Sequence, residues 1–84
     1  MAFDYRNLTS AHVRGARGLL GWSQDDLVEH SAVSKKTIQS IENDGKVLAR
    51  TLKNVCEAFE QAGIEFFNSD APGVRLHTDK QKDE

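Results

Sequence analysis

The middle of the chain carries a run of side chains that can donate hydrogen bonds to the edges of nucleic-acid bases. Lysine can donate to O6 and N7 of guanine, and glutamine can pair with N6 and N7 of adenine. If these side chains share the outward face of one helix, they could read base pairs in a major groove. The outward residues of this kind are Lys35, Lys36, Gln39 and Ser40.

Residue patterns that would support catalysis, metal binding or cofactor binding are missing from the sequence. His12, His30 and His77 have no ligand spacing among themselves, so we expect them at the surface. Cys56 is the single cysteine and cannot form an internal disulfide or, alone, a cysteine metal site. The glycines at 15–21 lie in a predicted helix, unlike a dinucleotide-binding loop. We therefore expect no enzyme, no metal and no cofactor.

Charge is distributed unevenly along the 84 residues, although the net charge is only −2. Residues 6–17 hold three arginines and no acid, and residues 34–53 hold five basic residues against two acids. From residue 54 onward three basic residues face seven acids. A folded domain could therefore present one basic face to a polyanion. The alternative is ordinary charge scatter over a solvated surface.

Length and hydropathy predict one small domain, residues 1–77, followed by a charged tail, residues 78–84, that we expect to be disordered. No apolar run is long enough to cross a bilayer, and the N-terminus lacks a basic-then-apolar signal segment. We therefore expect a cytoplasmic protein with no membrane partner.

The spacing of apolar residues predicts four helices, and local signals mark their ends. Ser23 and Ser34 are placed to cap the second and third helices, and Asp26 completes a capping box with Ser23. Asp44-Gly45 supplies a left-handed stop after the third helix. The second and third are short and closely spaced, which indicates a helix-turn-helix. The expected helices cover residues 9–20, 24–30, 35–43 and 50–62.

After the helices the pattern changes to alternation, which predicts a β-hairpin over residues 64–77. An isolated hairpin is marginal in water, so one face must pack on the helices. Phe67 points the other way and is either a lightly exposed aromatic residue or part of an interface with a second copy of the chain. The residues expected to face the helices are Ile64, Phe66, Val74 and Leu76.

The runs Ser23-Gln24-Asp25-Asp26-Leu27 and Val33-Ser34-Lys35-Lys36-Thr37-Ile38-Gln39-Ser40-Ile41-Glu42-Asn43, followed by Gly45, resemble the Cro-type phage-repressor family, also called the xenobiotic-response-element family. The resemblance covers about residues 10–62. It implies a mainly α, lambda-repressor-like bundle of four to five helices that binds operator DNA, usually as a two-fold dimer. A C-terminal hairpin departs from the commonest pattern of that family.

The resemblance also implies roles for individual residues. It places Ser34, Lys35, Lys36 and Ser40 near bases, and we add Gln39 because it faces outward with them. It implies that Arg17 pairs with Glu42, the alternative being a loose exposed pair. The residues expected to contact phosphates are Arg14, Gln24, Thr37, Asn43, Lys46 and Arg50.

We therefore expect a sequence-specific DNA-binding transcriptional regulator, a repressor, that reads an operator through residues 35–43 as a homodimer. Phe67 is the expected dimer contact. The alternative is a protein-interaction module of the same fold, antiactivator-like or antitoxin-like, that binds another protein through its acidic C-terminal end and hairpin.

Overall fold

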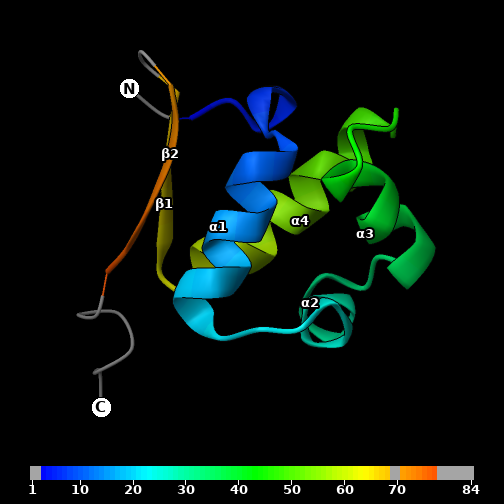
Figure 1. Cartoon of the computed structure of the whole chain (residues 1–84), viewed down its shortest axis with the longest axis horizontal. Helices are drawn as coiled ribbons and strands as arrows, with labels where there is room; N and C mark the ends of the chain where they lie inside the picture. Colours follow the sequence, from blue (N-terminus) through cyan, green and yellow to red (C-terminus); the bar gives the residue numbers. More distant parts are fainter. Residues whose placement is uncertain (1–2, 69–70, 78–84) are drawn as a thin grey trace.

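The computed structural model describes residues 3–68 and 71–77, and within them it contains four α-helices and one antiparallel hairpin (Figure 1). The mainly helical class and the hairpin are confirmed, and each helix begins and ends within one residue of its expected bounds. The tail, residues 78–84, lies outside the described residues. The elements are η1 (Tyr5–Asn7), α1 (Ser10–Leu20), α2 (Gln24–Ser31), α3 (Lys35–Glu42), α4 (Ala49–Gln61), β1 (Ile64–Asn68) and β2 (Pro72–Leu76).

Every helix contributes to one core. Phe59 of α4 is fully buried at its centre, and Trp22 stacks on it with ring centroids 5.6 Å apart. The Trp22 ring also stacks on His30, at 4.1 Å and nearly parallel. Trp22 is therefore a packing residue, and its ring contacts both α2 and α4. The other fully buried apolar residues are Val13, Ala16, Leu27, Ile38 and Val55.

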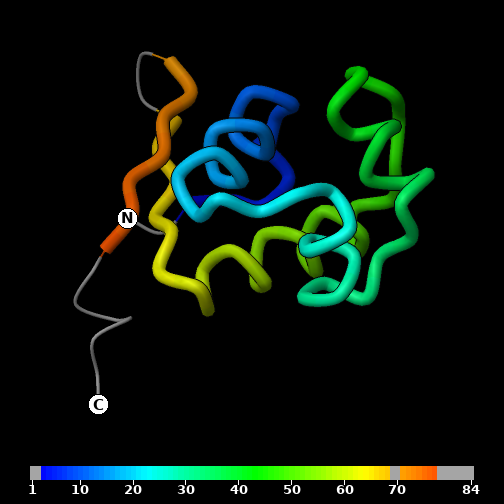
Figure 2. Tube along the Cα trace, turned by 60° about the horizontal axis from the view of Figure 1, so that its bottom comes forward, coloured from blue at the N-terminus to red at the C-terminus, as the bar shows by residue number. Residues whose placement is uncertain are grey.

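α1 lies between the hairpin and α3, so the hairpin and α3 are on opposite sides of this helix (Figures 1 and 2). Gly15 allows α1 to approach the hairpin closely, because a Cβ at this position would lie 3.1 Å from Cγ2 of Val74. Gly18 meets no atom within 4 Å at the same test. Of the two glycines, only Gly15 is needed for packing, and its partner is a strand.

The hairpin packs on the helices through the face predicted for it. Ile64 and Phe66 are 3% and 4% exposed, and Val74 and Leu76 are partly buried against the same core. The strands extend further than expected toward the turn, because Asn68 pairs with Pro72. Burying a side chain such as Phe66 contributes about 1.5–3 kcal/mol, which an isolated two-stranded sheet could not obtain.

His12 does not lie at the surface, so that expectation is wrong. Its ring is 1% exposed and lies between the rings of Phe3 and Phe66, with centroids 5.1 and 5.5 Å away. The Thr9 N–H donates to Nδ1 at 3.0 Å, which leaves the ring proton on Nε2 to be donated to the Phe67 carbonyl at 2.8 Å. His12 therefore completes a capping box for α1 and holds the end of β1 against that helix.

The left-handed residue that follows α3 is Asp44, with φ 62°, within the predicted Asp44-Gly45 stop. Aspartate tolerates this conformation better than most residues. Gly45 is required for a different reason: its N–H donates to the Ser40 carbonyl at 2.6 Å, and a Cβ would lie 3.0 Å from that oxygen. The helix thus ends at the expected place, with Asp44 in the left-handed conformation and Gly45 in close contact with the Ser40 carbonyl.

Candidate nucleic-acid interface

α3 has one buried face and one face open to solvent. Ile38 and Ile41 are 0% and 4% exposed, three residues apart, and anchor the helix to the core. Because a helix places residues three and four apart on the same side, the opposite side must face outward. That side carries Lys35, Lys36 and Gln39, which are exposed, and Ser40, which is half-buried.

The start of α3 is fixed by Ser34. Its Oγ accepts the Thr37 N–H at 3.2 Å and donates to the Thr37 hydroxyl at 2.9 Å. The predicted N-cap is therefore present. Ser34 and Thr37, expected near a base and a phosphate, already have their hydroxyls bonded to each other. Contact with DNA would have to use the remaining lone pairs or rearrange this cap.

The turn between α2 and α3 is built from two residues that the sequence patterns did not single out. Ala32 ends α2 in the left-handed region, with φ 60°. The buried Ser31 hydroxyl donates to the Leu27 carbonyl at 2.6 Å and accepts the Val33 N–H at 3.2 Å. These bonds satisfy buried backbone groups and set the direction in which α3 leaves α2. Alanine and serine carry no strong turn signal, which is why the pattern could not reveal them.

Arg17 and Glu42 form the predicted pair, and the pair is not a loose surface contact. Arg17 Nε lies 2.7 Å from Glu42 Oε2, and Nη2 lies 3.0 Å from Oε1. The Glu42 side chain is 6% exposed and that of Arg17 is 21% exposed. Arg17 also donates to the Trp22 carbonyl at 3.1 Å. The bidentate geometry offsets the cost of burying the carboxylate and joins α1 to α3.

Gln24 joins this network and connects it to the outward face of α3. Its Nε2 donates to Glu42 Oε1 at 3.2 Å, and its Oε1 accepts from Gln39 Nε2 at 3.4 Å. Gln24, expected at a phosphate, and Gln39, expected at a base, therefore touch each other. Both were predicted site residues, but their contact depends on the packing of α2 on α3 and had no signal in the sequence.

Arg14 also lies on Glu42. Its guanidinium donates to the Glu42 backbone carbonyl, and its Nε lies 4.0 Å from Oε1. The positive charge of Arg14 at the C-terminal end of α3 interacts favourably with the negative end of the helix dipole. The Arg14 side chain is still 56% exposed, so it remains open on one side. No pattern in the sequence indicated this contact at the helix end.

Lys35 meets an acid from the neighbouring helix. Its Nζ lies 3.2 Å from Oδ1 of Asp25, with side chains 52% and 75% exposed. Lys36, the next residue, has no ion pair among the described residues. Of the two lysines expected near bases, Lys35 is therefore ion-paired within the described residues and Lys36 is not.

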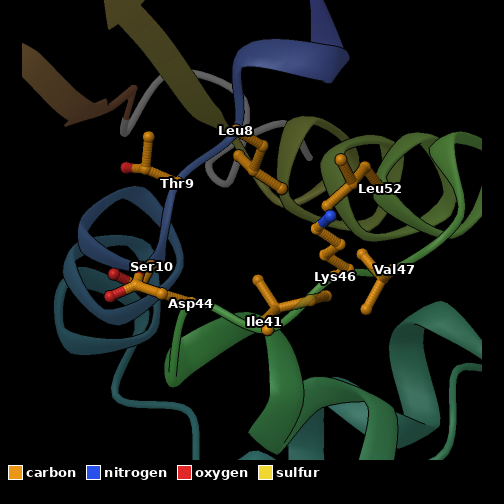
Figure 3. A pocket seen from close by; sticks show the side chains of 9 residues that line it. Leu8, Thr9, Ser10, Ile41, Asp44, Lys46, Val47 and Leu52 are labelled. Atoms are coloured by element: carbon orange, nitrogen blue, oxygen red, sulfur yellow. The ribbon is translucent and has the colours of Figure 1, made fainter.

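The flank beyond α3 carries exposed Asn43, Lys46 and Arg50, the remaining residues predicted to contact phosphates. Lys46 belongs to the wall of a pocket of about 420 Å³ between the start of α1, the α3–α4 loop and α4. Figure 3 shows its side chain extending across this pocket toward Leu8 and Leu52. The full lining is Leu8, Thr9, Ser10, Ile41, Asp44, Gly45, Lys46, Val47 and Leu52.

The outer face of the hairpin is charged around one aromatic ring. Phe67 is half-buried, and the Arg75 guanidinium lies 5.0 Å from its ring centroid. Arg75 also donates to Glu65 at 2.9 Å, and His77 contacts the same carboxylate. The hydrogen bond from Arg75, followed by that of His77, lowers the pKa of Glu65 below its ordinary value. The expected dimer contact is therefore an aromatic ring partly covered by a cation.

Cys56 is a free cysteine buried in the core. Burial, with the nearby acids Glu60 and Glu57, raises the pKa of Cys56 to about 12, so its thiol stays protonated at neutral pH. Within residues 3–68 and 71–77, no group of three or more His, Cys, Asp or Glu side chains is placed to hold a metal ion. In the same residues, no helix has both the length and the hydropathy needed to cross a membrane.

Comparison of the chain with protein-family models and with curated protein sequences finds no match.

Proposed function

We propose that the chain is a sequence-specific DNA-binding regulator of transcription, a repressor, that reads an operator through α3. The observation that carries the proposal is the exposed row of Lys35, Lys36 and Gln39 on a helix whose other face is fixed in the core. Their ammonium and amide groups match the acceptors of guanine and adenine edges in a major groove. A rigidly held short helix with long polar donors is suited to enter that groove.

The surroundings of α3 support the same function. The one acid within the helix, Glu42, is buried and bonded by Arg17, so it presents no open carboxylate to a phosphate backbone. Gln24 on one flank and Asn43, Lys46 and Arg50 on the other can contact phosphates, which would position α3 without reading sequence. Arg14, whose guanidinium is bonded to the Glu42 carbonyl, would neutralise phosphate charge from its position on α1.

The proposal includes the finer fold and assembly. The α2–turn–α3 arrangement and the Arg17–Glu42 bond support a lambda-repressor-like bundle of the Cro-type phage-repressor kind. One protomer offers a small footprint, so we propose a homodimer on two half-sites about one helical turn apart. The hairpin lies at the end of the molecule away from α3 (Figure 1). We propose that Phe67, on this hairpin, forms the dimer contact.

The test is selection of duplexes from a random-sequence pool by the purified protein. The expected result is enrichment of one motif, arranged as an inverted repeat if the dimer is present. Replacing Lys35 and Lys36 together by alanine should abolish binding to that motif while the thermal midpoint stays nearly unchanged. Lys53→Ala, an exposed lysine of α4, is the matched control and should bind normally.

Enrichment that survives the double substitution would contradict the assignment of α3. No enrichment of any duplex by the wild-type protein would overturn the proposed function. It would favour the alternative, a protein-interaction module that uses the hairpin and the acidic C-terminal end.

A further inference from the structure

Asp25 is an exposed acid at the edge of the surface proposed to meet DNA. It is the second residue of α2 and follows Gln24, which is proposed to contact a phosphate. Its carboxylate is 75% exposed and lies 3.2 Å from Nζ of Lys35, the first residue of α3. A carboxylate in this place repels a phosphate backbone and at the same time competes with it for the lysine.

The carboxylate of Asp25 has no other bonded partner in residues 3–68 and 71–77. The capping box of α2 is made by Ser23 and Asp26, whose side chain accepts the Ser23 N–H at 2.9 Å. Asp25 favours the N-terminal end of α2 through the helix dipole, but this contributes only about 0.3–1 kcal/mol. The fold therefore does not require a negative charge at residue 25.

We infer that Asp25 competes with DNA for Lys35 and thereby lowers the affinity of the protein for duplex DNA. This inference rests on the proposed function. In nonspecific complexes a protein is held by cation–phosphate contacts, and each such contact adds to the affinity. While Lys35 is paired with Asp25, it adds little to those contacts. In the specific complex Lys35 leaves Asp25 for a base edge, where the contact depends on sequence.

The inference predicts that one substitution tightens binding to duplex DNA. Asp25→Asn frees Lys35 and should tighten binding to a random-sequence duplex by up to about fivefold, the upper end of the range of exposed ion pairs. The salt dependence should steepen by about one contact. Binding to the selected operator duplex should tighten by at least as much, because Lys35 must leave Asp25 to reach a base edge in that complex.

The experiment is a double-mutant cycle of wild type, Asp25→Asn, Lys35→Ala and the double variant. Fluorescence anisotropy gives the affinity of each for the random-sequence duplex as salt is varied, and thermal unfolding confirms that all four fold. If Asp25 acts through Lys35, Asp25→Asn should have little effect when Lys35 is alanine. Glu29→Gln makes the same charge change on α2 at an exposed acid and sets the size of a general charge effect.

Equal tightening by Asp25→Asn with and without Lys35 would overturn the inference, because the acid would then act only through net charge. No tightening in the wild-type background would also overturn it. In both cases the wild-type protein still binds duplex, so the proposed function stands. If none of the proteins binds any duplex, the proposed function and this inference fail together.

Discussion

Glu42 is a nearly buried carboxylate beneath a surface proposed to approach a polyanion. Arg17 bonds both of its oxygens, Gln24 bonds Oε1, and Arg14 bonds its backbone carbonyl. Buried charges are tolerated only when they are paired and hydrogen-bonded, and all of these partners come from other helices. One side chain therefore links α1, α2 and α3.

Replacing Glu42 by glutamine should lower the free energy of unfolding by about 3 kcal/mol, because the part-buried Arg17 guanidinium loses its counter-charge. Urea denaturation measures the change. Glu29→Gln removes an exposed acid from α2 and should change stability by less than about 0.5 kcal/mol. Equal losses for the two variants would mean that the Arg17–Glu42 pair is no stronger than a surface contact.

His12 also joins distant parts of the chain. His12→Leu keeps a side chain of similar size but leaves the Thr9 N–H and the Phe67 carbonyl without their partners. We expect a loss of about 2–4 kcal/mol for two unpaired buried groups, with faster amide exchange in β1. His30→Leu, at an exposed residue, should cost less than about 1 kcal/mol. A His12 loss as small as this control would show that the two bonds contribute little.

At the scale of elements, α1 carries two glycines that differ in what surrounds them. Glycine destabilises a helix interior by about 1 kcal/mol relative to alanine. An alanine at Gly18 meets nothing, whereas an alanine at Gly15 would press on Val74 of β2. The same residue type is therefore a packing requirement at one position and an unopposed cost at the other.

Gly18→Ala should raise the free energy of unfolding by up to about 1 kcal/mol, with a higher thermal midpoint. Gly15→Ala should gain less or lose stability, because its Cβ would lie 3.1 Å from Cγ2 of Val74. Adding Val74→Ala should shrink the difference between the two alanine variants in a double-mutant cycle. Equal gains in the free energy of unfolding at both glycines would mean that α1 and β2 can move apart at little energetic cost.

The elements themselves could be predicted because their signals are local. Ser23, Asp26 and Ser34 act within one turn of their helices, and the alternation at 64–67 needs only neighbouring residues. The contacts of His12, Arg14 and Asp25 could not be predicted, since each depends on how elements pack. His12 and Phe67, for example, are 55 residues apart in sequence. Ala32 was missed because its left-handed backbone is imposed by the turn.

At the scale of the whole molecule, the candidate interface and the hairpin are separated. The residues proposed to contact DNA belong to the helices α1–α4 and the segments between them, and the hairpin lies on the far side of α1 (Figure 2). A net charge of −2 is therefore compatible with a locally basic surface, because charges beyond about 10 Å are screened at ordinary ionic strength.

Arg50→Ala should weaken binding to all duplexes alike and reduce the slope of log affinity against log salt by about one, as expected for one lost phosphate contact. Affinity measured over a salt series, on the selected operator and on random-sequence duplex, checks this. The result for Lys53→Ala on the same helix provides the baseline. An unchanged slope would remove Arg50 from the phosphate-contacting set.

Phe67→Ser should shift the mass in solution toward the monomer if the hairpin forms the dimer contact. Sedimentation equilibrium over a range of concentrations measures the shift. Phe67 is half-buried under Arg75, so thermal unfolding of the variant must accompany the mass. A folded variant with the wild-type mass would place the dimer contact elsewhere.

The division of α3 into an anchored side and an open side has an evolutionary consequence. Ile38, Ile41 and Glu42 carry the attachment to the rest of the molecule, while Lys36 and Gln39 contribute nothing to the core. New residues at the open positions would alter which sequence is preferred without disturbing folding. Paralogues could therefore diverge in target through a few codons, while sharing one unchanged scaffold.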